Sequence, residues 1–559
     1  MFQPLLLLLA ARFLAVTKAA PAATALPVVD LGYSLHQASS FNSTGRTYNF
    51  SNIRYAEPPI GDLRFRAPVP PQGGNRSVDR GLVGKVCPQA NPAWLLITEQ
   101  FVPAYLTGQP FNASAAEAVI EAAAASPGPA DPRETEDCLF LDVVVPEQIF
   151  NRASQSNTST KGAPVLVWIY GGGYTSGEKT GYGLYNPAGL IKASQIDGSD
   201  GVVYVALNYR LGAFGWLAGP TLQSDGTSNA ALYDQRLALQ WVQSNIHLFG
   251  GDPNRVTVFG QSAGAGSIMH QITAFGGLAG KAPFQQAILQ SAAFQNIPGN
   301  FEQEQTFNGF LSLLNVSTLQ EARQLPSNTL VQANIQQVGA SAYGQFTYNP
   351  VLDGLFAPGI PGKLLLQGSF DLNVKVMLGY NANEGLVFTS PFLANDTSYD
   401  AYVESSFPDI SPPVASYVQN ELYPAPSDNT PYEDNIGRSS VTIADSSFVC
   451  NTVYLERAFG NQTYTYQFST PPALHGQDVD YTFFNGPDAA VESDATAMAL
   501  QEYVTSFAAS GVPSGPSLPR FPLYGNDSRI LNLNGSSISE MTDPIAKERC
   551  LWWQKALYY

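Results

Sequence analysis

Positive charge is scarce in this chain of 559 residues, which carries 28 Lys and Arg against 45 Asp and Glu. The net charge of −17 leaves no basic surface with which to release counterions from nucleic acid or from an anionic membrane. Charged residues of both signs make up only 13% of the chain and hydrophobic residues 44%, which is ample for a large core. The composition therefore excludes a disordered chain and argues against nucleic acid as a partner.

Long apolar runs are also missing, because no stretch has the roughly 20 apolar residues of a transmembrane helix. The most apolar segment is N-terminal, where Leu5–Leu9 leads by way of further apolar residues to the small residues Ala19 and Ala20. This pattern is typical of a secretory signal peptide. It predicts a signal peptide over residues 1–20, a secreted extracellular chain over residues 21–559, and no stable membrane anchor.

Cysteine is limited to four residues, Cys87, Cys138, Cys450 and Cys550. A sparse, even set in a secreted chain indicates two structural disulfides, although four cysteines allow three pairings. Ten Asn-x-Ser/Thr sequons are candidate glycosylation sites, of which chance accounts for about half. They lie at Asn42, Asn49, Asn75, Asn112, Asn157, Asn315, Asn395, Asn461, Asn526 and Asn534.

Short, continuous apolar runs rich in β-branched residues indicate buried strands at residues 165–170, 202–207, 255–259 and 374–378. Residues 232–248 have helical periodicity, and Ser114 with Glu117 forms a capping box for a helix that ends near residue 125. Strands that alternate with helices predict an α/β fold with a large, mainly parallel central sheet flanked by helices. No segment resembles a linker, so we expect one domain over residues 21–559.

One serine stands between glycines directly after a predicted strand, in Gly260-Gln261-Ser262-Ala263-Gly264. The small residues that follow can begin a helix, so the pattern predicts the strand–turn–helix of a nucleophile elbow. Glycine permits the strained turn, and the helix N-terminus directs backbone N–H groups at the reacting centre. A glycine-rich turn with an idle serine is the structural alternative.

Histidine is as scarce as cysteine, and a serine hydroxyl needs a base to take its proton. His36 precedes the predicted sheet, His247 ends a predicted helix, and His270 lies on the helix after Ser262, about 12 Å along its axis. His475 lies in a loop after a predicted strand at residues 463–468, where α/β sheets carry catalytic groups. Elimination therefore predicts His475 as the base.

The acid that orients the histidine has two candidates. Glu384 lies in a turn after the predicted strand 374–378, and Asp353 lies in another turn. The chain order Ser262, Glu384, His475 is the order expected of an α/β-hydrolase, and Asp353 remains the competitor. The glycine run at residues 171–173 directly follows the strand 165–170, so its backbone amides can approach a tetrahedral oxyanion without side-chain obstruction.

With these residues in place, the chain resembles the type-B carboxylesterase family, which includes cholinesterases and fungal lipases, over about residues 45–555. The motifs that carry the resemblance are YAEPP at 55–59, LRF at 63–65, EDCLFLD at 136–142, WIYGGG at 168–173, DQRLALQWV at 234–242 and FGGDP at 249–253. In character the chain is closest to the secreted fungal carboxylesterases. The resemblance implies an α/β-hydrolase fold with a disulfide-closed flap, and a serine carboxylic ester hydrolase without metal or organic cofactor. It also implies Glu384 as the acid, N–H donors at Gly172, Gly173 and Ala263, and disulfides Cys87–Cys138 and Cys450–Cys550.

Two departures from the cholinesterase pattern concern the substrate. Cholinesterases have an acidic residue just before the nucleophile that helps to hold a cationic substrate, and this chain has Gln261. We therefore expect a small-molecule ester that is uncharged or lipophilic. The loop between Cys87 and Cys138 is longer than in cholinesterases and closer to a lipase flap. Its run Trp94–Ile97 either covers a lipophilic acyl pocket and contacts an interface, or packs on the core.

Two rival functions use the same sequence features. An acyltransferase, or a lactone-forming or lactone-opening enzyme of a natural-product pathway, would use this triad with an alcohol in place of water. A non-catalytic adhesion protein of the family is more distant, because such proteins lack members of the triad and this chain retains all three. The sequence does not predict an oligomeric state.

Overall fold

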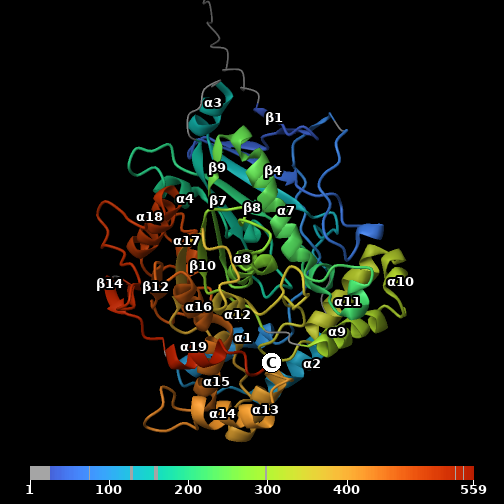
Figure 1. The fold of residues 1–559 in the computed structure, drawn as a ribbon, viewed down its shortest axis with the longest axis vertical. Coiled ribbons are helices and arrows are strands. Elements are labelled where there is room, and N and C mark those ends of the chain that lie inside the picture. Colours follow the sequence, from blue (N-terminus) through green and yellow to red (C-terminus); the bar gives the residue numbers. More distant parts are fainter. Residues whose placement is uncertain are drawn as a thin grey trace, which may run out of the picture.

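The computed structural model describes residues 26–74, 76–125, 130–155, 162–295, 299–535, 537–545 and 547–559. The predicted signal peptide and the sequons Asn75 and Asn157 lie outside the described residues. Within them, a central sheet lies between layers of helices (Figure 1), which confirms the predicted α/β class.

In the described part of the chain the central sheet has eleven strands, in the order β14-β13-β12-β11-β10-β9-β7-β8-β6-β4-β3. The strands from β13 to β8 are parallel, and the strands at both edges are antiparallel. Their bounds are β3 Ser40–Asn42, β4 Thr47–Arg54, β6 Phe140–Pro146, β7 Ala163–Ile169, β8 Val203–Leu207, β9 Gly251–Gln261, β10 Gln286–Gln290, β11 Lys375–Asn381, β12 Tyr464–Phe468, β13 Arg529–Asn534 and β14 Ser537–Thr542. A second, small sheet joins β1 Val28–Asp30, β2 Leu35–Gln37 and β5 Val78–Asp79.

Helices cover both faces of the parallel strands, with α4 and α18 on one side and α7 on the other (Figure 1). Every residue of β8 is buried, which explains why this strand is a continuous apolar run rather than an alternating pattern. The main helices are α1 Leu95–Leu106, α2 Ala113–Ala125, α3 Glu147–Gln155, α4 Ala188–Ala193, α7 Ala230–Asn245, α8 Ala263–Ile272, α9 Asn300–Leu313, α11 Ser327–Gly339, α13 Asp396–Ser406, α15 Asn435–Ala444, α16 Cys450–Ala458, α18 Asp494–Ser510 and α19 Lys547–Trp553. Shorter ones are α5 Gly212–Trp216, α6 Pro220–Gln223, α10 Leu319–Gln324, α12 Pro361–Leu366, α14 Pro412–Tyr417 and α17 Asp478–Thr482.

The predicted elements differ from the observed ones mainly at their ends. The strand predicted at 255–259 is the end of the longer β9, and the helix predicted at 232–248 is α7 followed by a 3₁₀ turn, Ile246–Phe249. The capping box at Ser114 is wrong, because α2 begins one residue earlier. Asn112 caps it, since its Oδ1 accepts a hydrogen bond from the Ala115 N–H at 3.1 Å.

The two disulfides pair as the family resemblance implied. Cys87–Cys138 closes a loop that contains α1 and α2, hereafter the flap, and Cys450–Cys550 joins α16 to α19. A buried ion pair fixes the base of the flap, because Arg64 Nη2 lies 2.6 Å from Glu136 Oε1. The C-terminal end of the flap is therefore tied to the core through Glu136 as well as through the disulfide.

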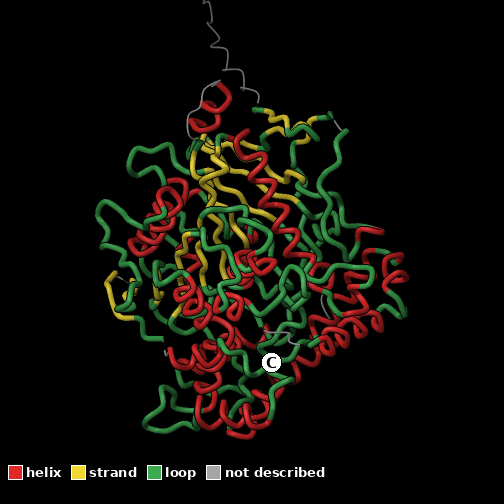
Figure 2. The backbone as a smooth tube through the Cα atoms, viewed as in Figure 1, coloured by secondary structure: helices red, strands yellow, loops and turns green. Residues whose placement is uncertain are grey.

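Beyond the carboxyl ends of the parallel strands, the chain is mostly helices and loops, which fill the lower part of the tube in Figure 2. The flap, α9, α13 and the π-helical turn Asp445–Val449 (η7) belong to this region. Among the residues that the structure describes, no helix is both long enough and apolar enough to cross a membrane.

Candidate active site

Ser262 stands in the turn between β9 and α8, with φ 56° and ψ −126°. The close packing of this turn requires glycine on both sides. A Cβ on Gly260 would lie 2.5 Å from the Ile169 carbonyl oxygen, and one on Gly264 only 2.0 Å from it. These contacts give the strand–turn–helix geometry that the sequence predicted for a nucleophile elbow.

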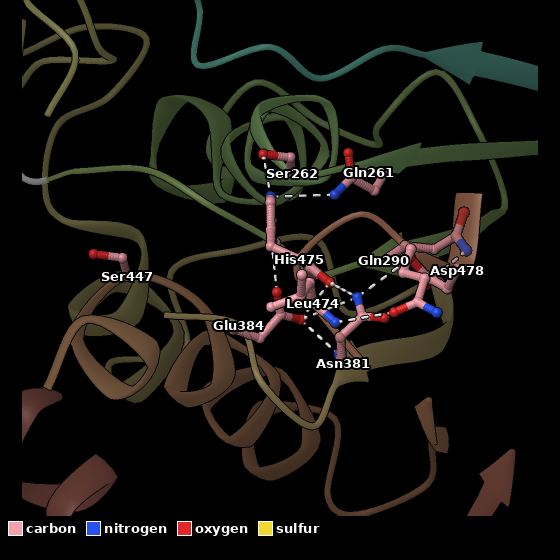
Figure 3. A network of polar contacts seen from close by, with 12 residues as sticks. Gln261, Ser262, Gln290, Asn381, Glu384, Ser447, Leu474, His475 and Asp478 are labelled. Carbon is pink, nitrogen blue, oxygen red and sulfur yellow. Dashed lines mark hydrogen bonds and ion pairs between the residues drawn. The ribbon is translucent and has the colours of Figure 1, made fainter. Parts of the chain in front are cut away.

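His475 and Glu384 complete a continuous line of hydrogen bonds from Ser262 (Figure 3). His475 Nε2 lies 2.9 Å from Ser262 Oγ, and His475 Nδ1 lies 2.5 Å from Glu384 Oε2. Glu384 follows the end of β11 and His475 lies in the loop after β12, so adjacent parallel strands bring them together. The rings of Phe388 and Phe448 pack on the imidazole, with centroids at 5.1 and 4.6 Å.

The carboxylate of Glu384 is buried and held by two close donors. Ser291 Oγ donates to Glu384 Oε1 at 2.5 Å, and the Asn381 N–H donates to the same oxygen at 2.6 Å. Sequence reasoning missed Ser291, which directly follows β10 and has no motif around it. These bonds leave Oε2 directed at the histidine, as an orienting acid requires.

A second buried carboxylate, Asp478, lies to one side of Ser262, His475 and Glu384, beyond Asn381 (Figure 3). It accepts hydrogen bonds from Tyr466 Oη at 2.7 Å and Gln290 Nε2 at 3.1 Å. Burial raises the pKa of Asp478, and the nearby charge of Glu384 raises it further. Asp478 makes no hydrogen bond to His475 among the described contacts, so Glu384 is the carboxylate that contacts the imidazole.

The competing sequence candidates lie elsewhere. Asp353 caps its own turn and accepts hydrogen bonds from Asn229 and from the Leu355 and Ala357 N–H groups. His36 belongs to the small second sheet, and His247 to the 3₁₀ turn after α7. His270 contacts the Gly266 carbonyl within α8, and burial lowers its pKa to about 4, so it stays neutral. The structure brings only His475 to Ser262.

Three backbone amides are available beside Ser262. Gly173 and Ala263 line the same cavity as Ser262, and Gly172 adjoins them. Among the described residues, the N–H groups of Gly172, Gly173 and Ala263 donate no hydrogen bond within the protein. Unpaired amides beside a nucleophile are the arrangement that an oxyanion hole needs.

Gln261, the residue before Ser262, also contacts His475 (Figure 3). Its Nε2 lies 3.2 Å from His475 Nε2, the nitrogen that faces Ser262 Oγ. An amide N–H can donate to the lone pair of a neutral imidazole. The single lone pair of Nε2 is thus shared between the Ser262 hydroxyl and the Gln261 amide, on the side of the ring opposite Glu384.

The cavity at Ser262, hereafter the catalytic pocket, is small and aromatic. Its volume is about 30 Å³, and its apolar walls include Phe294, Phe346, Phe388 and Phe448. Trp94 of the flap stands behind these walls, fully buried, with its Nε1–H donating to the Gln345 carbonyl at 2.9 Å. Of two further flap residues, Ile97 is buried, with 2% of its surface exposed, and Leu96 is exposed, with 55%.

The predicted glycosylation sites that the structure describes are mostly on the surface. Asn42, Asn112, Asn315, Asn395, Asn526 and Asn534 are exposed, whereas Asn49 and Asn461 are half-buried. Over the same described residues, no three His, Cys, Asp or Glu side chains converge as metal ligands would.

Comparisons with known proteins agree with this geometry. The Carboxylesterase family profile matches residues 36–553. A "Carboxylesterase patB" from Penicillium expansum is 41% identical over 558 residues, which cover 98% of each chain. The protein of the same name from Aspergillus clavatus is 43% identical over 541 residues, covering 95% of this chain and 96% of that one. The crystal structure of Aspergillus niger EstA has a TM-score of 0.77 and 25% identity, and covers 95% of this chain and 98% of EstA. The chain therefore belongs to the carboxylesterase family and is a carboxylic ester hydrolase.

Proposed function

We propose that the mature chain, residues 21–559, is a secreted esterase that hydrolyses uncharged esters through an acyl-enzyme on Ser262. The observation that carries the proposal is the unbroken series Ser262–His475–Glu384, with distances of 2.9 and 2.5 Å. Secretion is supported by the N-terminal apolar segment, the two disulfides and the exposed sequons.

In the first half-reaction, Ser262 Oγ attacks the ester carbonyl carbon while His475 Nε2 takes the hydroxyl proton. The N–H groups of Gly172, Gly173 and Ala263 receive the oxyanion, and Glu384 stabilises the charged imidazole. The tetrahedral intermediate collapses when the carbon–oxygen bond to the alcohol breaks and His475 gives its proton to the leaving oxygen. Water, deprotonated by His475, then attacks the acyl-enzyme and releases the acid.

The preference for uncharged esters is supported by the surroundings of Ser262. Gln261 replaces a residue that would carry a negative charge beside a cationic substrate, and the walls of the catalytic pocket are aromatic. An ionic group placed there would lose its hydration without a charged partner. The part of the substrate next to the scissile bond is therefore neutral and apolar.

Contact of the flap with a lipid–water interface is a separate part of the proposal. Leu96 and Leu106 of α1 are 55% and 44% exposed, while Trp94 anchors the flap to the core. If the flap responds to an interface, the rate on tributyrin rises steeply when the concentration passes the solubility limit. A rate that follows simple saturation through that point would contradict this part of the proposal and support packing alone.

The central test is Ser262→Ala, assayed with p-nitrophenyl acetate and with a fluorophosphonate probe. We expect loss of turnover by a factor on the order of 10⁴ or more, and loss of labelling, because among the described residues no other hydroxyl contacts His475. Ser244→Ala, an exposed serine on α7, is the matched control and should leave both unchanged. Near-normal turnover in Ser262→Ala would falsify the assignment. Analysis of products with a competing alcohol present separates hydrolysis from acyl transfer.

A further inference from the structure

A second cavity, hereafter the vestibule, adjoins the catalytic pocket and has about 270 Å³ of space against about 30 Å³. The two cavities share six lining residues, namely Gln295, Gly344, Phe346, Asn349, Ile443 and Ser447. The vestibule is therefore the immediate neighbour of the catalytic pocket, and these six residues stand between or around the two spaces. None of the proposed catalytic residues lines the vestibule.

Polar and apolar atoms share the wall of the vestibule about equally, whereas the wall of the catalytic pocket is mostly apolar. Ser405 and Ser406 come from the end of α13, Ser446 and Ser447 from η7, and Gln345 from the loop after α11. The apolar part of the wall comes from Phe346, Phe407, Pro408, Ile443 and the ring of Tyr402. Such a wall offers both donors and acceptors to a bound molecule.

Several of these polar groups have spare hydrogen-bonding capacity. The Ser447 hydroxyl lies apart from the triad, on the side away from Asp478, and has no hydrogen-bond partner among the described residues (Figure 3). The Ser405 hydroxyl donates to the Tyr402 carbonyl at 3.0 Å, which leaves its lone pairs available. A ligand group that both donates and accepts, such as a hydroxyl, suits these positions.

The charge at the vestibule excludes anions. Glu302 lines it, and the buried Oε2 of Glu302 has no hydrogen-bond partner in the described part of the chain. No Lys, Arg or His among the described residues lines the vestibule to balance this carboxylate. A second negative charge brought there with the substrate would be repelled at short range.

We propose that the vestibule binds a hydroxyl-bearing portion of the ester substrate that has no negative charge, while the catalytic pocket holds the apolar part next to the scissile carbonyl. The substrate class is thus a small hydroxylated ester rather than a long-chain glyceride. This inference rests on the proposed function, because it assigns the specificity of the same serine esterase.

The experiment compares kcat/KM within two pairs of esters that differ only in hydroxyl groups. Propyl acetate and 2,3-dihydroxypropyl acetate vary the alcohol part, and methyl butanoate and methyl 3,4-dihydroxybutanoate vary the acyl part. We expect the hydroxylated member to be preferred about tenfold in one pair, which corresponds to one or two net hydrogen bonds. Equal rates, or preference for the plain ester, in both pairs would overturn the inference.

Variants of the vestibule test whether it causes the preference. Ser447→Ala should reduce the ratio of kcat/KM in the preferred pair about fivefold, and Ser406→Ala/Ser447→Ala should bring it close to one. Because both esters use the same triad, any general loss of activity cancels in the ratio. Ser244→Ala should keep the wild-type ratio. An unchanged ratio in the double variant would overturn the inference, whereas failure of the wild type to hydrolyse p-nitrophenyl acetate would overturn the proposed function itself.

Discussion

Replacement of Gly173 by alanine tests whether the backbone amide at this position stabilises the oxyanion. Gly173 has φ +60°, and an added Cβ would lie 2.2 Å from a ring carbon of Phe346. Ordinary carbon–carbon contact is about 3.5 Å, so either the ring or the backbone must shift by roughly 1 Å. The two responses have different consequences, because only a backbone shift moves the N–H group.

The size of the loss in kcat depends on whether the Phe346 ring or the backbone at residue 173 moves. A left-handed conformation costs a non-glycine residue about 1–2 kcal/mol, which favours a change in the backbone at residue 173. Misplacing one oxyanion donor lowers kcat by about 10²–10³-fold, equivalent to roughly 3–4 kcal/mol. The neighbouring Gly172 offers no such choice, because its Cβ would meet the Ser176 carbonyl oxygen at 2.1 Å, and that oxygen belongs to the backbone.

The assay is kcat for p-nitrophenyl acetate in Gly173→Ala, Phe346→Ala and Gly173→Ala/Phe346→Ala, with circular dichroism to verify folding. We expect kcat to fall about 10²-fold in Gly173→Ala. Removal of the ring in the double variant should restore kcat to within about tenfold of Phe346→Ala, leaving the left-handed strain. A Gly173→Ala enzyme with wild-type kcat would refute the reasoning that a side chain there displaces an oxyanion donor.

Three other predictions concern the groups around the triad. Glu384→Gln should lower kcat about 10³–10⁴-fold, because the imidazolium loses its buried counter-charge; a loss under tenfold in p-nitrophenyl acetate turnover would contradict that role. Gln261→Glu should shift the acidic limb of the kcat/KM profile to higher pH by on the order of one unit, because a carboxylate would stabilise the imidazolium. Gln261→Met is the uncharged control. An acidic limb that does not move in Gln261→Glu would be evidence against the contact between residue 261 and His475. Burial lowers the pKa of His270 from 6.5 to about 4, so the unfolded chain binds its proton more tightly and stability is lost as the pH falls from 6.5 towards 4. His270→Gln should therefore reduce the loss of unfolding free energy between pH 7 and pH 5 by about 2 kcal/mol, as measured by urea denaturation, and an unchanged loss would show that other groups cause it.

The proximity of Ser262 and His475 could be predicted, because the motif around Ser262 is local and the chain has few histidines. The glycines around Ser262 are required by backbone packing against Ile169, and that requirement is visible as a motif. Elimination among four histidines placed His475 beside Ser262, where the structure has it. Buried parallel strands were predictable for a similar reason, since burial on both faces makes each of them a continuous apolar run.

Ser291 could not be predicted, because nothing in its neighbourhood distinguishes it from an ordinary serine after a strand. Its role depends on β10 lying between β9 and β11, which brings Ser291 to Glu384 across 93 positions of sequence. The vestibule was equally hidden, since its walls come from α9, α13, η7 and the loop after α11. Strand order and the packing of distant helices are long-range properties that a local pattern does not carry.

Gln261 shows how a correct local observation can have a larger meaning in three dimensions. The sequence identified it only as the absence of an acidic residue that would attract a cation. In a regular strand, residues 261 and 262 would point to opposite faces of the sheet. The left-handed backbone of Ser262 turns the chain at that point, so both side chains reach the same nitrogen of His475, at 3.2 and 2.9 Å. A charge at residue 261 would therefore act on the proposed base, His475, as well as on a charged substrate, whereas the neutral amide of Gln261 places no second carboxylate beside the imidazole.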